Sequence, residues 1–258
     1  MAESHEKTAI ITGASSGIGA ATAFELARRG VHVAIGARRE SRLADVAQTI
    51  RNEGGRVFAH ALDVTDAESV ERFCAGAEAA LGHVDVLINN AGENRAGLIH
   101  EVSPEHLRSD VEINLLGAVF MTRFVLPGML ARRRGDVVFI GSDSARHPRP
   151  YQSAYAAAKQ GLEAFARVLE METEGTGVRS IVIRVGPTGS EFGNQMPKDQ
   201  IVKILESWKY WGVFRHMHWM PGEHVARAIA RLIETPVEES YPTILEIQPG
   251  GRAKGDGS

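Results

Sequence analysis

The stretch Thr12-Gly13-Ala14-Ser15-Ser16-Gly17-Ile18-Gly19-Ala20 decides the fold, because it joins an apolar run to a helical pattern. The run before it, Thr8–Thr12, has the composition of a buried strand, and Gly17–Arg29 repeats apolar residues at helical spacing. Glycines let the backbone turn sharply and approach a ligand closely, and a helix that begins there offers free N–H groups and the positive end of its dipole. The stretch therefore predicts a pyrophosphate site in a first strand–helix–strand unit.

The glycines are spaced G-x-x-x-G-x-G rather than G-x-G-x-x-G, and the Gly-Lys-Ser/Thr ending of a P-loop is missing. Either glycine pattern is weak alone, but its place between a strand and a helix favours dinucleotide binding. We expect six residues of this turn to contact the cofactor: Gly13, Ser15, Ser16, Gly17, Ile18 and Gly19.

Short apolar runs alternate with amphipathic stretches along the rest of the chain. The runs are rich in Val and Ile and predict strands buried on both faces at Thr8–Thr12, His32–Gly36, Val57–Leu62, Val84–Asn89, Asp136–Gly141, Val178–Val185 and Thr243–Ile247. The stretches predict helices at Gly17–Arg29, Ser41–Glu53, Asp66–Ala80, Ser103–Arg133 and Ser153–Glu174, with Asp66 as an N-cap and with ends at Gly30, Gly54, Gly82 and Gly135. The order predicts an α/β fold: a doubly wound, Rossmann-type parallel sheet of about seven strands with helices on both faces.

No linker-like composition divides the chain, so we expect residues 1–258 to form a single dinucleotide-binding and catalytic domain. The segment at about 188–221 is long for a connection, which is typical of a substrate lid. It holds the aromatic and methionine residues Trp208, Tyr210, Trp211, Phe214, Met217, Trp219 and Met220. A lid over an apolar substrate and an oligomer contact explain this clustering equally well.

The chain has 258 residues, of which 43% are hydrophobic and 24% charged, with a net charge of −3. This charge argues against nucleic acid as the main partner. We expect no signal peptide in the polar stretch Met1–Lys7 and no membrane span, because the apolar runs are too short. The single cysteine, Cys74, is expected in the core and suits a reducing compartment. We therefore expect a cytoplasmic protein. His216, His218 and His224 lack metal spacing, and we assign no metal.

The end of the second strand decides which dinucleotide fits. A carboxylate there would bind the adenosine ribose 2′-hydroxyl of NAD, but the strand runs into Arg38 and Arg39, and Glu40 comes too late. A guanidinium can hold a 2′-phosphate by charge and by paired hydrogen bonds. We therefore predict NADP(H), with Arg38 as the main contact; the alternative is that both arginines only cap a loop.

Polar residues also follow the third and fourth strands. Asp63, followed by Val64, could accept from the adenine amino group or could only cap a turn. Asn89-Asn90-Ala91-Gly92 could brace the strand ends beside the cofactor, although a tight turn alone could use these residues. We count Asp63, Val64, Asn90, Ala91 and Gly92 among the predicted cofactor contacts.

Tyr155 and Lys159 share one face of a predicted helix, because they are four residues apart. A free tyrosine has a pKa of about 10, and a nearby ammonium stabilises the phenolate and lowers that pKa. An oxidised nicotinamide would add a further positive charge. The pair therefore predicts general acid–base catalysis by Tyr155.

Ser142 strengthens this prediction, because a hydroxyl at the end of the fifth strand can donate to a substrate oxygen; Asp143 and Ser144 compete on spacing alone. Asn114 lies among apolar neighbours in the predicted helix Ser103–Arg133. It is either a satisfied core amide or holds a water behind Lys159.

These residues together resemble the short-chain dehydrogenase/reductase family. The matching pieces appear in family order over nearly the whole chain: Thr12-Gly13-x3-Gly17-Ile18-Gly19, Asn89-Asn90-Ala91-Gly92, Asn114, Ser142 and Tyr155-x3-Lys159. The resemblance implies that Tyr155 passes the proton, Ser142 orients the substrate oxygen, Lys159 binds the nicotinamide ribose and Asn114 anchors a water. It also implies a homotetramer or homodimer, often built on the two long helices.

The chain departs from the family pattern after the sixth strand. The family commonly shows Pro-Gly there, whereas this chain has Gly186-Pro187-Thr188-Gly189-Ser190; Pro187 can still end the strand and Ser190 could still reach the carboxamide. A second departure, Ala158 in place of a frequent Ser, is expected to be mild.

The leading hypothesis is an NADP(H)-dependent oxidoreductase that interconverts a ketone or aldehyde and an alcohol, on a hydrophobic small molecule. The alternative is a non-catalytic NADP(H)-binding regulatory or scaffold protein, which would need only the glycine turn and Arg38. A third hypothesis is an isomerase or dehydratase that reuses a bound nicotinamide.

Overall fold

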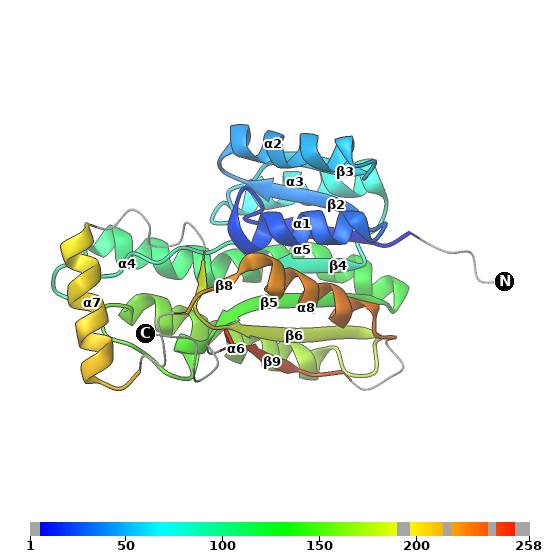
Figure 1. Cartoon of the computed structure of the whole chain (residues 1–258). Helices are drawn as coiled ribbons and strands as arrows, with labels where there is room; N and C mark the ends of the chain where they lie inside the picture. The colour runs from blue at the N-terminus through cyan, green and yellow to red at the C-terminus, as the bar shows by residue number, and fades with distance from the viewer. Residues whose placement is uncertain (1–5, 190–196, 214–217, 237–240, 251–258) are drawn as a thin grey trace.

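The computed structural model describes residues 6–189, 197–213, 218–236 and 241–250. Seven parallel strands form one sheet in the order β3-β2-β1-β4-β5-β6-β9 (Figure 1). Their bounds are Thr8–Thr12 for β1, His32–Ala37 for β2, Val57–Ala61 for β3, Val86–Asn89 for β4, Gly135–Ser142 for β5, Val178–Val185 for β6 and Ile244–Ile247 for β9. The predicted doubly wound parallel sheet is confirmed.

Helices cover both faces of this sheet because its strands are apolar on both sides. One core packs α1 (Gly17–Arg28), α2 (Glu40–Asn52) and α8 (Gly222–Glu234) against one face. The other core packs α3 (Ala67–Leu81), α5 (Gly117–Arg132) and α6 (Ser153–Glu172) against the opposite face. Successive residues of β1 take part in different cores, Ala9 and Ile11 in the first and Ile10 in the second.

The long helix predicted at Ser103–Arg133 is one continuous helix with a change of geometry inside it. The α-helix α4 (Pro104–Val111) passes into a π-helical turn, Glu112–Leu116, before α5 begins. By length and composition this helix could cross a membrane, but its α5 part packs on the sheet and 44% of the most apolar window is buried. Packing of this kind is that of a core helix.

Two predicted helix ends behave differently. Asp66 caps α3 as predicted, its carboxylate accepting from the backbone N–H of Glu68 at 3.0 Å. Gly135 does not end α5: it opens β5, and Arg133 takes the left-handed conformation at the helix end with φ of 53°. The prediction was wrong because the strand begins earlier than the apolar run.

The segment predicted as a lid contains a helix, α7 (Lys198–Tyr210), and two short strands. β7 (Thr188–Gly189) and β8 (Met220–Pro221) pair in parallel, so both ends of the segment are held together. α7 stands outside the two helix layers, beside α4 at the left of Figure 1. Gln200 fastens it by donating to the carbonyl of Ala96 at 3.0 Å.

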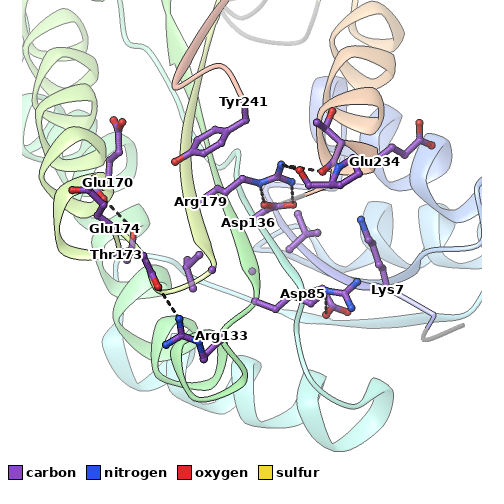
Figure 2. Close-up of a pocket in the computed structure, with 18 of the residues that line it drawn as sticks. Lys7, Asp85, Arg133, Asp136, Glu170, Thr173, Glu174, Arg179, Glu234 and Tyr241 are labelled. Carbon is purple, nitrogen blue, oxygen red and sulfur yellow. Dashed lines mark hydrogen bonds and ion pairs between the residues drawn. The ribbon is translucent and has the colours of Figure 1, made fainter. Parts of the chain in front are cut away.

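A cavity of about 790 Å³ opens at the amino ends of the strands, the end opposite the glycine turn (Figure 2). Arg179 crosses it and donates from Nε and Nη2 to the two carboxylate oxygens of Asp136, at 2.6 and 2.9 Å. Nη1 donates to the carbonyl of Thr235 at 2.9 Å, and the guanidinium lies 5.4 Å from the ring centroid of Tyr241. These contacts join β5, β6 and the end of α8, which gives the cluster a structural role.

Candidate functional site

The glycine turn has a shape that only glycine permits. Gly13 and Gly17 have φ values of 66° and 57°. A Cβ on Gly13 would lie 2.8 Å from the Cα of Ala91, and one on Gly19 would lie 2.5 Å from Nδ2 of Asn90. α1 begins at Gly17 with no acidic residue in its first turn, so its free N–H groups face no competing carboxylate. The turn fits a pyrophosphate.

Asn90 fixes the turn to the end of β4. Its Nδ2 donates to the carbonyl of Thr12 at 2.8 Å, and the backbone N–H groups of Asn90 and Ala91 donate to Oγ1 of Thr12. Gly92 lies against Asn114, because a Cβ there would be 2.7 Å from Oδ1 of that residue. Asn90, Ala91 and Gly92 therefore lie at the edge of the glycine turn, and their contact with a cofactor stays a prediction.

The two arginines after β2 make different contacts. Arg39 lies over the glycine turn and donates to Oγ of Ser15 at 3.0 Å and to Oγ of Ser16 at 2.6 Å. Arg38 is exposed and donates to Glu93 at 3.3 Å. The guanidinium that contacts the turn is thus that of Arg39, whereas the sequence predicted Arg38 as the main cofactor contact.

Asp63 makes the contacts of a turn residue. Its Oδ1 accepts from the backbone N–H and the hydroxyl of Thr65, at 3.0 and 2.8 Å, while its own N–H donates to Ser69. Val64 is buried, and Gly117 leaves room for its side chain. These contacts are those of a residue that stabilises a turn, the second role predicted for Asp63. Its contact with an adenine stays a prediction.

The predicted catalytic residues come together from β5, α6 and the π-helical turn. Tyr155 and Lys159 are both buried on α6, and Nζ of Lys159 lies 5.8 Å from the tyrosine ring centroid. Nζ donates to the carbonyl of Ile140 in β5 at 2.8 Å. Ser142, the last residue of β5, forms a hydrogen bond with Tyr155. Two elements, β5 and α6, thus place a hydroxyl, a phenol and an amine in one site.

Burial sets the proton affinities of this pair in the protein alone. It raises the pKa of Tyr155 to about 12, against the hydrogen bond from Ser142, which lowers it. Burial also lowers the pKa of Lys159 to about 8. The sequence predicted that Lys159 lowers the pKa of Tyr155. In the protein alone burial outweighs this effect, because it removes water from the charged forms of both groups.

Asn114 shows why the helix changes geometry at this position. Its Nδ2 donates to the carbonyls of Glu93 and Asp110, at 2.6 and 2.8 Å, and π-helical turns often occur at functional sites. Oδ1 is buried and has no hydrogen-bond partner among the described residues. A buried carbonyl oxygen without a partner fits a bound water, the second of the two predicted roles.

Sequence reasoning missed a group of residues next to Ser142, formed by Asp143, Arg149 and Trp208. Arg149 forms a buried ion pair with Asp143, which had been considered only as a competitor of Ser142. Trp208 of α7 lies on Arg149, its ring centroid 5.2 Å from the guanidinium carbon. The sequence does show a basic residue, Arg149, six positions before Tyr155. Its burial could not be predicted, because it depends on the position of Trp208 in α7.

The other residues of the segment predicted as a lid divide into two groups. Trp208 and Met220 are buried, whereas Tyr210, Trp211 and Trp219 are exposed, so the aromatic residues do not form one surface. The carbonyl of Pro187 accepts from the N–H of Met220 at 3.0 Å. Ser190, Phe214, His216 and Met217 lie outside the described residues. Within the described part of the chain, no set of three His, Cys, Asp or Glu side chains could hold a metal ion.

Comparison with known proteins agrees with this geometry. The family model described as short chain dehydrogenase matches residues 7–201. The chain belongs to the short-chain dehydrogenase family. A short chain dehydrogenase of Pseudocercospora fijiensis is 41% identical over 201 residues, which cover 76% of this chain and 63% of that protein.

Solved structures of the family share the fold over nearly the whole chain. An alcohol dehydrogenase from the archaeon Thermococcus sibiricus, complexed with 5-hydroxy-NADP, is 30% identical with a TM-score of 0.81, covering 96% of this chain and 100% of that one. The closed form of a serine dehydrogenase complexed with NADP⁺ is 27% identical with a TM-score of 0.83, covering 97% and 98%. The nicotinamide dinucleotide of these neighbours is the kind of cofactor that the glycine turn fits.

Proposed function

We propose that this short-chain dehydrogenase is a cytoplasmic enzyme that interconverts a ketone or aldehyde and an alcohol with NADP(H), on a hydrophobic small molecule. The observation that carries the proposal is the buried set of Ser142, Tyr155 and Lys159 beside a turn that only glycine permits. A scaffold protein would need the turn but would gain nothing from burying a phenol and an amine together, because each loses hydration.

The chain's own residues would handle the proton. NADPH held at the glycine turn and by the two arginines would supply hydride-transfer chemistry at the carbonyl carbon. Ser142 donates a hydrogen bond to the carbonyl oxygen, and the phenol of Tyr155 gives that oxygen its proton. Lys159 stabilises the phenolate, and the water that fits Oδ1 of Asn114 carries a proton back from solvent. Oxidation of the alcohol reverses these steps.

We infer NADP(H) rather than NAD(H) from the charges around the glycine turn. Arg38 and Arg39 directly follow β2 and could hold a 2′-phosphate, and β2 itself ends without a carboxylate to bind a free 2′-hydroxyl. NADP is also the cofactor named with two of the structural neighbours. Pro187 and Ser190 are further proposed cofactor contacts, with Ser190 at the carboxamide.

We further propose that residues 1–258 act as one catalytic domain, with the segment at about 188–221 over the substrate, and that the protein assembles as a homodimer or homotetramer through α5 and α6. The buried Trp208 supports the lid, and exposed Leu116, Leu130, Val168 and Met171 support the assembly.

NADPH oxidation with cyclohexanone, acetophenone and benzaldehyde tests the activity, with Tyr155→Phe as the matched variant. Loss of the proton donor should lower kcat by about 10²–10⁴-fold while NADPH still binds, because the ring is kept. Turnover that survives Tyr155→Phe would refute the mechanism. Tight NADPH binding without turnover on any carbonyl would favour the scaffold alternative.

A further inference from the structure

A buried ion pair lies directly beside the catalytic hydroxyls. Asp143 follows Ser142 at the end of β5, and its carboxylate pairs with the guanidinium of Arg149; the two side chains are 6% and 12% exposed. Oδ1 of Asp143 lies 3.5 Å from Oγ of Ser142, and Nε2 of Gln248 lies 3.4 Å from Oδ2. A carboxylate buried this deeply costs free energy unless a cation compensates it.

The same guanidinium contacts the lid. The indole of Trp208 lies on Arg149, and its Nε1 donates to the carbonyl of Pro150 at 2.9 Å. Arg149 therefore lies between α7 on one side and the catalytic strand end on the other. Its Nε is buried without a hydrogen-bond partner in the part of the chain that the structure describes.

Four charged groups act on the phenol of Tyr155. Lys159 comes from its own helix, Asp143 from the turn after β5, Arg149 from the loop before α6 and Asp110 from α4. The two carboxylates raise the pKa of Tyr155 and Arg149 lowers it. Because Arg149 is paired with Asp143, it cancels part of the field of that carboxylate at the phenol.

We propose that Arg149 is a positioning residue of the reaction: it neutralises Asp143 beside Ser142 and Tyr155 and holds α7 over them through Trp208. The proposal rests on the proposed function, because it assigns Arg149 a part in the proton transfer by Tyr155. Without Arg149, an uncompensated carboxylate would stand beside the phenolate that alcohol oxidation requires. With the pair intact, its two charges balance, which suits an uncharged carbonyl substrate.

The pH dependence of kcat/KM for NADP⁺-linked oxidation of 1-phenylethanol tests this in four variants. One limb of this pH profile is set by the pKa of Tyr155. Arg149→Gln should move that limb to higher pH by about one unit, because it removes a cation, and Asp143→Asn should move it to lower pH by a similar amount, because it removes a carboxylate. The double variant should return close to the wild type. Arg149→Lys keeps the charge and should leave the limb in place, although a weaker fit under Trp208 should raise KM.

A merely structural role would lower the rate of every variant without moving the limb, and this result would overturn the proposal. Shifts of Arg149→Gln and Asp143→Asn in the same direction would also overturn it. If Arg149→Gln does not fold, Asp143→Asn and Arg149→Lys decide by the same criterion.

A second readout needs no substrate and separates this inference from the proposed function. The phenolate absorbance of Tyr155 is taken as the difference between each protein and its Tyr155→Phe counterpart. In the wild type it should titrate near the pKa of about 12, and in Asp143→Asn at lower pH. An unmoved titration refutes the inference even if the enzyme turns over. A wild type that turns over no carbonyl refutes the proposed function, and a titration that still moves would then leave only the electrostatic effect of the Arg149–Asp143 pair on Tyr155 standing.

Discussion

Asp110 is a buried carboxylate close enough to Tyr155 to act on its charge, and no sequence pattern singles it out. Burial raises its pKa to about 6, against the backbone N–H of Arg95, which lowers it. Its Oδ1 has no partner among the described residues. Its backbone carbonyl accepts a hydrogen bond from Nδ2 of Asn114. The same bond orients the Asn114 amide, which is the residue predicted to hold a water.

Asp110→Asn should therefore change stability in a pH-dependent way. The folded protein holds the proton of Asp110 more tightly than the unfolded chain, so this group favours folding below its unfolded pKa of 3.8 and loses that effect as pH rises towards 6. The variant should gain stability over the wild type between these values, by on the order of 1 kcal/mol, in urea unfolding at about pH 4 and about pH 7. Asp45→Asn, on the exposed face of α2, is the control; an equal gain at both pH values would contradict the argument.

Arg38 and Arg39 can be separated by cofactor affinity. A charge-assisted hydrogen bond contributes about 1.5–3 kcal/mol, so loss of the arginine that holds the 2′-phosphate should weaken NADPH binding by roughly 10–100-fold and leave NADH unchanged. The predicted order is a larger loss for Arg38→Ala than for Arg39→Ala, and fluorescence titration measures it. Arg51→Ala, an exposed arginine of α2, controls for net charge. Equal losses of affinity for NADPH and NADH would show that neither arginine binds the 2′-phosphate and that both only stabilise the loop.

The strands and helices of this protein could be predicted because each carries a local pattern. Strands such as β1 and β6 are apolar on both faces, and the glycine turn fixes the place of the first crossover. The π-helical turn at Asn114 leaves no such pattern, because its cause is a pair of carbonyls, one of them on a different segment of the chain. Arg149 was missed for a related reason: only the position of α7 makes it a buried residue.

The pair Arg179–Asp136 joins β5 and β6 at the amino ends of the sheet. Arg179→Met leaves the Asp136 carboxylate buried without its partner and should lower the free energy of unfolding by about 3–5 kcal/mol. Urea unfolding measures this. The matched control is Arg28→Met, which breaks an exposed pair with Glu53 and should change stability little. Similar losses of unfolding free energy for the two variants would show that burial of the Arg179–Asp136 pair does not make it more important than an exposed pair.

At the scale of the whole molecule, α5 and α6 lie in the same layer and leave apolar side chains in water. Four of them are 36–68% exposed: Leu116 just before α5, Leu130 near the end of α5, and Val168 and Met171 three residues apart on α6. A two-fold assembly would bring the same face of each chain together, so any residue near the axis meets its own copy. These exposed apolar side chains are the physical reason to expect an interface on this layer.

Val168→Glu should therefore break the assembly, because a two-fold axis would place two carboxylates close together in an apolar contact. Light scattering after size-exclusion chromatography should show the wild type at a multiple of the chain mass and the variant at a smaller one. Val202→Glu introduces the same charge at an exposed valine of α7 and should leave the mass unchanged. Dissociation by Val202→Glu instead would place the contact on the lid, and the exposed aromatic residues near the end of α7 would then belong to the interface.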